Sequence, residues 1–89
     1  SENLDLAPPQ PNPTAGSFTI DFTLPRAGNA CVELLDVAGR RVLVRSLEAL
    51  GAGRQTIRLL PERRLPSGLY LVRVHQGDRT ATRRVCVLR

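Results

Sequence analysis

The chain has 89 residues, of which 42% are hydrophobic and 24% are charged, and its formal net charge is +5. This composition is that of a folded domain and excludes an intrinsically disordered chain, and the length provides for one hydrophobic core. No apolar run reaches the roughly 18 residues of a membrane-spanning helix. The N-terminal residues lack a basic head followed by an apolar stretch, so we expect any signal for inner-membrane transport to lie on a longer parent protein.

The charged and aromatic residues argue against two common kinds of binding module. All 13 cationic side chains are arginines, spread from Arg26 to Arg89 among eight carboxylates. Nucleic-acid binding domains instead gather their charge on one face and carry a known motif. The aromatic residues are Phe18, Phe22 and Tyr70, which leaves few platforms for stacking on sugars or unpaired bases. We therefore expect no nucleic-acid partner, and the scarcity of aromatic residues argues against a carbohydrate site.

The first 13 residues, SENLDLAPPQPNP, hold four of the chain's seven prolines. Proline-rich segments stay extended and cannot continue a helix or a central strand. The pattern predicts a linker over residues 1–13, either joined to an upstream domain of the same parent chain or ending as a disordered tail. The folded domain is then expected over residues 14–89.

Alternation of apolar and polar side chains predicts the first two strands. Residues 17–24, SFTIDFTL, alternate without exception, and residues 30–35, ACVELL, alternate again after a turn that contains Pro, Gly and Asn. Asp36 and Gly39 then favour a hairpin turn. A returning strand is expected over residues 41–47.

The following residues predict a loop and one more strand. Residues 48–53, EALGAG, are too short and too rich in glycine for a helix, and we expect a loop there. Residues 55–60, QTIRLL, alternate again and end at Pro61.

The last two strands form the second predicted hairpin. Residues 69–74, LYLVRV, are apolar on both faces, which places this strand inside its sheet. A turn over residues 76–78 leads into the final segment. Two registers stay open: a two-residue loop would place Val72 opposite Ala81, and a three-residue loop would place it opposite Thr82. The two registers turn opposite faces of the last segment toward the core.

Six or seven short strands separated by turns, with no helical pattern of ten residues, predict an all-β fold. The expected architecture is an immunoglobulin-like antiparallel β-sandwich of about seven strands. The Cys, Trp, Cys arrangement of antibody domains is missing, so this likeness is one of architecture.

The sequence contains no recognisable catalytic group. Asp21 and Glu33 stand on the polar side of their strands, where we expect solvent-exposed carboxylates rather than an acid–base pair. His75 has no nucleophile nearby in the sequence, and Gly51 to Gly53 lack the Lys and Ser or Thr of a phosphate-binding loop. We expect neither an enzyme nor a cofactor.

Two cysteines, Cys31 and Cys86, leave two interpretations open. They could form a disulfide in an oxidising compartment, or stay as free, partly buried thiols. A zinc site is not expected, because there is no C-x-x-C pair and a single histidine.

Four stretches taken together point to a family: PNPTAGSFTIDFTLPRAG, LLDVAGRRV, LPSGLYLVRV and TATRRVCVLR. In this order and spacing, from Pro11 to Arg89, the chain resembles the C-terminal sorting domain (type A, Por class) of proteins that Bacteroidetes-type bacteria export by the type IX secretion system. Each stretch alone is a weak signal, whereas the four in order are specific.

The resemblance implies a seven-stranded immunoglobulin-like sandwich that is a signal and not an enzyme. The parent protein would cross the inner membrane, fold in the periplasm, and be exported across the outer membrane because the type IX translocon recognises this domain. In many members a sortase-like peptidase then removes the domain near its proline-bearing linker and anchors the cargo at the cell surface. The alternative function is an immunoglobulin-like accessory module, a spacer or a carbohydrate-binding domain, of a multidomain surface enzyme.

The resemblance also assigns residues to the motifs of the family. The linker motif is Pro11, Asn12 and Pro13, and the first hairpin motif is Asp36, Gly39 and Arg40. The residues implied in recognition lie in the last two strands: Gly68, Tyr70, Val72, Arg73, Arg83, Arg84, Val85, Val87, Leu88 and Arg89.

Three residues depart from the family pattern, namely Leu35, in place of an aromatic residue, and the two cysteines.

The sorting interpretation also requires Arg89 to be encoded by the last codon of the parent gene. We expect the final strand to be recognised by edge addition, with arginines supplying charge complementarity.

Overall fold

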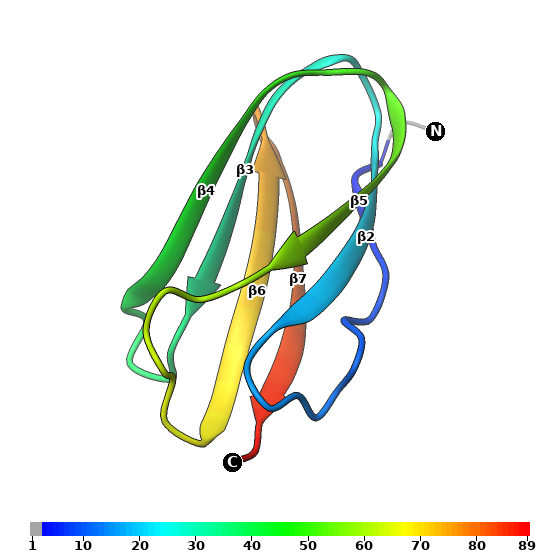
Figure 1. The fold of residues 1–89 in the computed structure, drawn as a ribbon. Helices are drawn as coiled ribbons and strands as arrows, with labels where there is room; N and C mark the ends of the chain where they lie inside the picture. The colour runs from blue at the N-terminus through cyan, green and yellow to red at the C-terminus, as the bar shows by residue number, and fades with distance from the viewer. Residues whose placement is uncertain (1–2) are drawn as a thin grey trace.

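Two antiparallel sheets face each other in the computed structural model, which describes residues 3–89. Figure 1 shows the two layers, with β2 and β5 in front of β6 and β7. The three-stranded sheet has the order β1-β2-β5, with β1 (Asp5–Leu6), β2 (Phe18–Leu24) and β5 (Gly53–Leu59). The four-stranded sheet has the order β4-β3-β6-β7, with β4 (Arg41–Leu50), β3 (Gly28–Leu35), β6 (Gly68–Gln76) and β7 (Arg79–Val87). The predicted all-β sandwich of about seven strands is confirmed.

The core lies between the sheets and follows the alternation of the sequence. Every second residue of β2, from Phe18 to Leu24, is at most 2% exposed. The facing sheet contributes alternate residues of its strands, which are Val32, Leu34, Tyr70, Val72, Val74, Val85 and Val87. Because side chains in a strand point alternately to opposite faces, one apolar set fills the space between the layers and the polar set faces outward.

The N-terminal segment belongs to the sandwich. Leu4 and Leu6 are 7% and 5% exposed and lie in the core cluster. The Ala7 amide donates to the Asp21 carbonyl, and Gln10 bridges Thr19 of β2. Two leucines ahead of the prolines, within the segment expected as a linker, thus supply core surface. The expectation for residues 1 and 2 lies outside the described residues.

The connection between β4 and β5 is shorter than the sequence predicted. The expected loop over residues 48–53 is wrong, because β4 continues to Leu50 and β5 begins at Gly53. The Ala49 amide donates to Asn29 Oδ1 at 2.9 Å, which ties the end of β4 to β3. A turn of two residues then carries the chain from one sheet to the other (Figure 1).

The register of the last hairpin differs from both expected alternatives. Val72 pairs with Arg83, because the strands stay paired up to Gln76 and Arg79 and leave a two-residue turn at Gly77 and Asp78. Gly77 has a φ of 59°, a conformation that glycine adopts without steric cost. This register turns Val85 and Val87 into the core.

The interior position expected for β6 is confirmed, since it lies between β3 and β7. Its two faces are treated differently, however. Tyr70, Val72 and Val74 are buried, whereas Leu69 and Leu71 on the outer face are 43% and 37% exposed. Among residues 3–89, no element covers that outer face, because the sandwich has two layers only.

Truncation of Leu6 tests the inclusion of the N-terminal segment in the fold. We expect Leu6→Ala to lower the free energy of unfolding by about 2–5 kcal/mol, the usual cost of removing a buried leucine side chain. Urea denaturation measures the change. The control is Leu60→Ala at a residue that is 53% exposed, which should cost about 0.5 kcal/mol or less. Equal costs for the two variants would show that residues before 14 are a spacer.

Candidate functional site

The Pro-Asn-Pro motif and the final strand, at opposite ends of the sequence, are bound to each other. Asn12 Nδ2 donates to the Arg84 carbonyl at 3.2 Å, and Asn12 Oδ1 accepts from the Cys86 amide at 2.9 Å. Two residues later, the Thr14 amide donates to the Cys86 carbonyl at 2.8 Å and the Thr14 carbonyl accepts from the Leu88 amide at 2.9 Å. The segment thus supplies a short partner strand for β7, in which the side-chain amide of Asn12 takes the place of a peptide group.

These bonds close part of an exposed sheet edge. β7 is the edge strand of the four-stranded sheet, and alternate residues of an antiparallel edge strand direct their backbone groups outward. From the Arg84 carbonyl onward these groups are occupied by Asn12 and Thr14. Within residues 3–89 the open part of this edge is left to Thr80, Thr82 and the Arg84 amide. The end of β7 therefore does not present the free edge on which the predicted strand addition depends.

Four of the residues implied in recognition belong to the core. Tyr70, Val72, Val85 and Val87 are at most 5% exposed, and the Tyr70 hydroxyl donates to the Pro66 carbonyl at 2.7 Å. Gly68 begins β6 opposite Val87. These residues hold the hairpin in place and offer no side chain to a partner.

Two of the predicted arginines are tied into the fold. Arg83 Nε donates to the Leu6 carbonyl at 2.7 Å, so that its side chain reaches from β7 across to β1. Arg89 donates through its amide to Ser67 Oγ at 3.0 Å and through Nε to the Leu65 carbonyl. Both side chains satisfy backbone carbonyls, which gives them a structural role.

Arg73 is tied into a cluster around Glu33 on the outer face of the four-stranded sheet. Glu33 was expected to be exposed to solvent, and this is wrong, since it is 4% exposed. Its carboxylate lies 2.8 Å from Arg73 Nη2, 3.4 Å from Arg41 Nη1 and 3.5 Å from His75 Nε2. Burial by itself raises the pKa of Glu33, but the hydrogen bond and charge of Arg73, with His75 and Arg41, outweigh it and lower the pKa.

Asp21 conforms more closely to its expected exposure. Its side chain is 34% exposed on the outer face of the three-stranded sheet. A hydrogen bond from the Thr56 hydroxyl, and then one from Arg54, lower the pKa of Asp21. Asp21 and Glu33 lie on different sheets and form no acid–base pair.

Arg84 and Leu88 are the two predicted recognition residues that reach solvent without an interaction of their side chains within residues 3–89. Leu69 and Leu71 join them, because Leu71 pairs with Arg84 and Leu69 pairs with Cys86 across the hairpin. Sequence reasoning missed these two leucines as surface residues. The signal was present in the apolar character of β6 on both faces, from which we inferred only that β6 lies inside its sheet.

The disulfide left open by the sequence is absent, because Cys31 and Cys86 are free thiols. Cys31 pairs with His75 and Cys86 pairs with Leu69, so the two thiols are separated by β6 and by six residues along it. At about 3.3 Å per residue that is about 20 Å, whereas a disulfide needs Cα atoms within about 7 Å. Burial, and then the charge of Glu33, raise the pKa of the Cys31 thiol.

The first hairpin motif has a local structural role. Asp36 Oδ1 accepts from the amides of Ala38 and Arg40, and Asp36 Oδ2 lies 2.9 Å from Arg40 Nε. The Arg40 amide is the main reason that the pKa of Asp36 is lowered. Gly39 has a φ of 83°, which a residue with a Cβ adopts only with strain. The motif therefore fixes the turn between β3 and β4.

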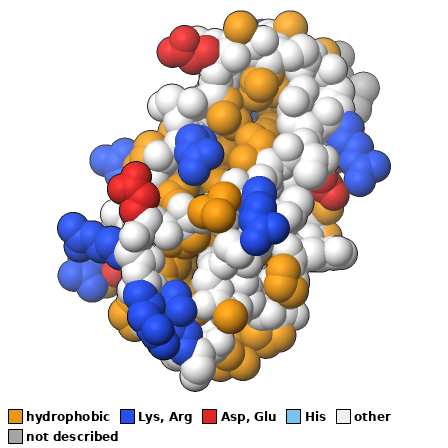
Figure 2. Space-filling view, in the orientation of Figure 1, with side chains coloured by type: hydrophobic (Ala, Val, Ile, Leu, Met, Phe, Trp, Pro, Cys, Tyr) orange, Lys and Arg blue, Asp and Glu red, His pale blue; other side chains and the backbone are white. Residues whose placement is uncertain are grey.

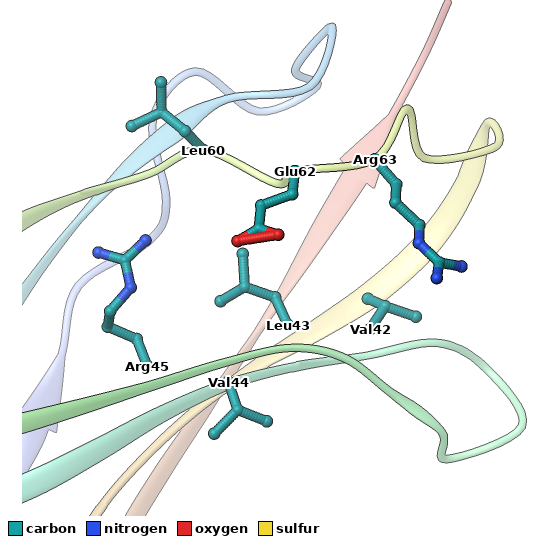
Figure 3. Close-up of a pocket in the computed structure, with 7 residues that line it drawn as sticks. All are labelled: Val42, Leu43, Val44, Arg45, Leu60, Glu62 and Arg63. Carbon is teal, nitrogen blue, oxygen red and sulfur yellow. The ribbon is translucent and has the colours of Figure 1, made fainter.

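A groove at the opposite edge of the sandwich is the other candidate binding site. It lies between β4 and the connection from β5 to β6, where Leu43 and Arg45 point toward the connection and Glu62 points toward β4 (Figure 3). The groove has a volume of about 270 Å³, and Val42, Val44, Leu60 and Arg63 complete its lining. Both signs of charge meet in an open groove, which selects for neither an anion nor a cation.

Other kinds of site find little support in the described residues. Within residues 3–89, no three His, Cys, Asp or Glu side chains gather to hold a metal ion, and no helix is long and apolar enough to span a bilayer. On the face drawn in Figure 2, acidic, hydrophobic and neutral side chains stand among the basic ones, which lie close together only at the lower left. That face offers no continuous basic surface for a nucleic acid.

Substitution of Glu33 tests the charge cluster. The lowered pKa means that the unfolded chain, with an ordinary glutamate pKa of 4.5, takes up the proton first as the pH falls. The stabilisation by Glu33 is therefore complete above about pH 4.5 and is lost as the pH falls through the folded-state pKa. We expect Glu33→Gln to lower the free energy of unfolding at neutral pH and to cost much less at about pH 3.

Urea denaturation at the two pH values measures this difference. The matched control is Glu48→Gln, at an exposed residue of the neighbouring strand β4, which should change little at either pH. A cost of Glu33→Gln that stays constant with pH would contradict an ionic role for the cluster.

Comparison with known proteins supports the sorting interpretation. A family model described as the secretion system C-terminal sorting domain matches residues 10–88, which include the Pro-Asn-Pro motif and the whole of β7. No curated protein and no solved structure was found to match the chain.

Proposed function

The chain belongs to the family of secretion system C-terminal sorting domains and is a sorting signal for type IX secretion, and from this premise we propose that the signal is read as a folded sandwich rather than as a linear tail. One observation carries the proposal. The two motifs at opposite ends of the sequence are joined by four hydrogen bonds from Asn12 and Thr14, three to β7 and one to Leu88 directly after it. A receptor that met the tail alone would meet none of this arrangement.

The family determines the general setting of the function. Sorting domains of this kind are generally non-catalytic, and a type IX signal implies interaction with the type IX system and export to the cell surface or the extracellular space. We propose in addition that a cargo domain precedes the sandwich in the parent chain. The parent folds in the periplasm, and the outer-membrane translocon then binds the sandwich.

We further propose that a sortase-like peptidase removes the domain and anchors the cargo. The packing of the N-terminal segment restricts where this cut is made. Leu4 and Leu6 are buried in the core, and Gln10, Asn12 and Thr14 are hydrogen-bonded to β2 or β7. A peptidase needs an accessible, extended stretch of backbone, so the cut falls before Leu4 and not among the prolines.

Disruption of the core tests whether the folded form is the signal. Residues 1–89 are fused to a periplasmic reporter in a bacterium with the type IX system, and reporter at the surface is measured relative to total reporter. We expect Val72→Asp to abolish surface delivery, because it places a carboxylate at a residue that is 0% exposed. The final residues 83–89 stay unchanged in this variant. Val37→Asp, at a residue that is 81% exposed, is the matched control and should deliver normally.

Degradation of an unfolded Val72→Asp fusion would also lower the amount of reporter at the surface, so a second variant keeps the core intact. Asn12→Ala removes the two side-chain bonds to β7, each worth about 1 kcal/mol, and leaves the core intact. We expect reduced delivery, with an intermediate level for Asn12→Asp, which keeps the acceptor for the Cys86 amide. Normal delivery of Val72→Asp, with loss of delivery after deletion of residues 83–89, would show that the tail is read as a linear sequence.

The position of the cut is tested on the released domain. Mass spectrometry of its N-terminus should find the first residue at or before Leu4. Leu4→Asp should loosen the segment, since Leu4 is 7% exposed, and should permit cuts farther along the chain. A first residue between Ala7 and Pro13 in the unsubstituted protein would contradict the proposed position.

A further inference from the structure

The outer surface of the last hairpin joins two residues of the family's recognition motif, Arg84 and Leu88, to three residues that the motif does not include, Leu69, Leu71 and Cys86. We define the outer hairpin face as Leu69 and Leu71 of β6 with Arg84, Cys86 and Leu88 of the final segment. We propose that this face docks on a protein surface of the type IX apparatus that presents a carboxylate to Arg84 and apolar side chains to the leucines. The inference rests on the proposed function, since it names the surface by which the folded signal is read.

The strand register places these side chains next to one another. Leu71 is the direct partner of Arg84, and Leu69 is the direct partner of Cys86. Residues two apart in a strand share a face, so the two leucines form a row along β6 beside a row made by Arg84 and Cys86. Leu69, Leu71 and Leu88 are 43%, 37% and 56% exposed. Contiguous exposed apolar side chains at one end of a small domain mark an interaction site.

The lack of a side-chain partner separates Arg84 from Arg73, Arg83 and Arg89. Arg73 is paired with Glu33, the buried carboxylate of the same outer face. Arg83 and Arg89 are bound to backbone carbonyls. Among residues 3–89, the side chain of Arg84 has neither an ion pair nor a hydrogen bond. Its guanidinium group is therefore free to pair with a carboxylate of a partner, a geometry to which the planar group is suited.

The shape of the face favours a protein over a small ligand. Five hollows on the described surface are lined by other residues, and none includes a member of the outer hairpin face. Small ligands bind in concave sites, whereas a pleated sheet face is matched by another extended surface. One unpaired cation between leucines is also too little charge for an anionic membrane or a nucleic acid, which require clusters of cations.

The closed edge of β7 favours binding through the face. Strand addition would need free backbone groups along the edge, and Asn12 and Thr14 occupy them from the Arg84 carbonyl onward. The side chains of the outer hairpin face, in contrast, stay accessible after those bonds have formed. A partner can therefore read the end of β7 while the fold stays intact.

Charge reversal at Arg84 tests the docking surface in the reporter fusion described above. We expect Arg84→Glu to reduce surface delivery about tenfold, because a like charge then faces the carboxylate of the partner. Arg84→Lys should keep most of the delivery. The matched control is Arg64→Glu, which changes the net charge equally at another exposed arginine and should deliver normally. Thermal unfolding of the variants confirms that each is folded.

The outcomes separate this proposal from the one on which it rests. Normal delivery of Arg84→Glu, together with loss of delivery in Val72→Asp, would contradict the proposed docking face but not the proposal that the signal is recognised in its folded form. Normal delivery of both variants would contradict the proposal of a folded signal as well. Equal loss for Arg84→Glu and Arg64→Glu would overturn the docking face in favour of a dependence on net charge.

The two native cysteines allow a direct test of contact. In a Cys31→Ser variant, a photoreactive thiol label on Cys86 stands within the outer hairpin face. In a Cys86→Ser variant, the same label on Cys31 stands on the same sheet but beside His75. The purified, labelled domain is illuminated with outer-membrane vesicles of a type IX bacterium or with protein-free lipopolysaccharide vesicles.

We expect a crosslink from Cys86, and not from Cys31, to a protein that antibodies identify as a component of the type IX apparatus. Crosslinks from Cys86 to lipopolysaccharide alone would overturn the proposal in favour of a lipid surface. Crosslinks between two copies of the domain would overturn it in favour of self-association. Equal crosslinking of the apparatus from both positions would show that the contact is not confined to the outer hairpin face.

Discussion

The side-chain amide of Asn12 is the contact on which the arrangement of this domain depends. It donates to one backbone group of β7 and accepts from the next, and Thr14 continues the same ladder. An aspartate could only accept and a leucine could do neither, so the amide is the side chain that imitates a peptide group on both sides. The consequence is that the N-terminal segment and the final strand are held in one structure, although more than 70 residues separate them in the sequence.

The same contact addresses a general difficulty of sandwich domains. An edge strand exposes a row of unpaired backbone groups, and such a row invites pairing with other chains. Here Asn12 and Thr14 cover the end of one edge strand, β7. Arg83 of β7 and Arg45 of β4, the strands at the two edges of the larger sheet, both pair with buried valines and so stand on the inner face. Inward-pointing charges on edge strands oppose pairing with further strands. They therefore oppose aggregation of the domain before the secretion apparatus recognises it.

The sequence predicted the features that follow from the alternation of apolar and polar residues along a strand. It did not predict the features that depend on contacts between residues far apart in the chain. The strands after the prolines and the core face of β2 followed mainly from period-two patterns, and the interior position of β6 followed from its apolar residues on both faces. Leu4 and Leu6 were missed because a two-residue strand shows no period and the prolines that follow suggest a spacer. The burial of Glu33 was missed because its cover comes from Arg41, Arg73 and His75 on neighbouring strands. Only the pairing of β3 with β4 and β6 brings those side chains together.

The sequence could not assign roles to the individual residues of the candidate site. The resemblance placed recognition in the last two strands, and it could not separate arginines that serve the fold from arginines that face a partner. That separation depends on which way each side chain points, and therefore on the hairpin register. With Val72 opposite Arg83, alternation turns Arg83 inward to β1 and Arg84 outward to solvent. A register shifted by one residue would have exchanged the two roles.

Nothing in the fold requires a cation at position 84. Arg83, Arg89 and Arg73 each satisfy a carbonyl or a carboxylate of the domain, whereas the side chain of Arg84 binds no group among residues 3–89. A contact made by one cation and a few leucines is smaller than a stable protein interface, so it is weak and quickly reversed. Charge complementarity mainly accelerates encounter and selects the partner. Weak binding with fast encounter fits a signal that has to be recognised during export and then released by its receptor.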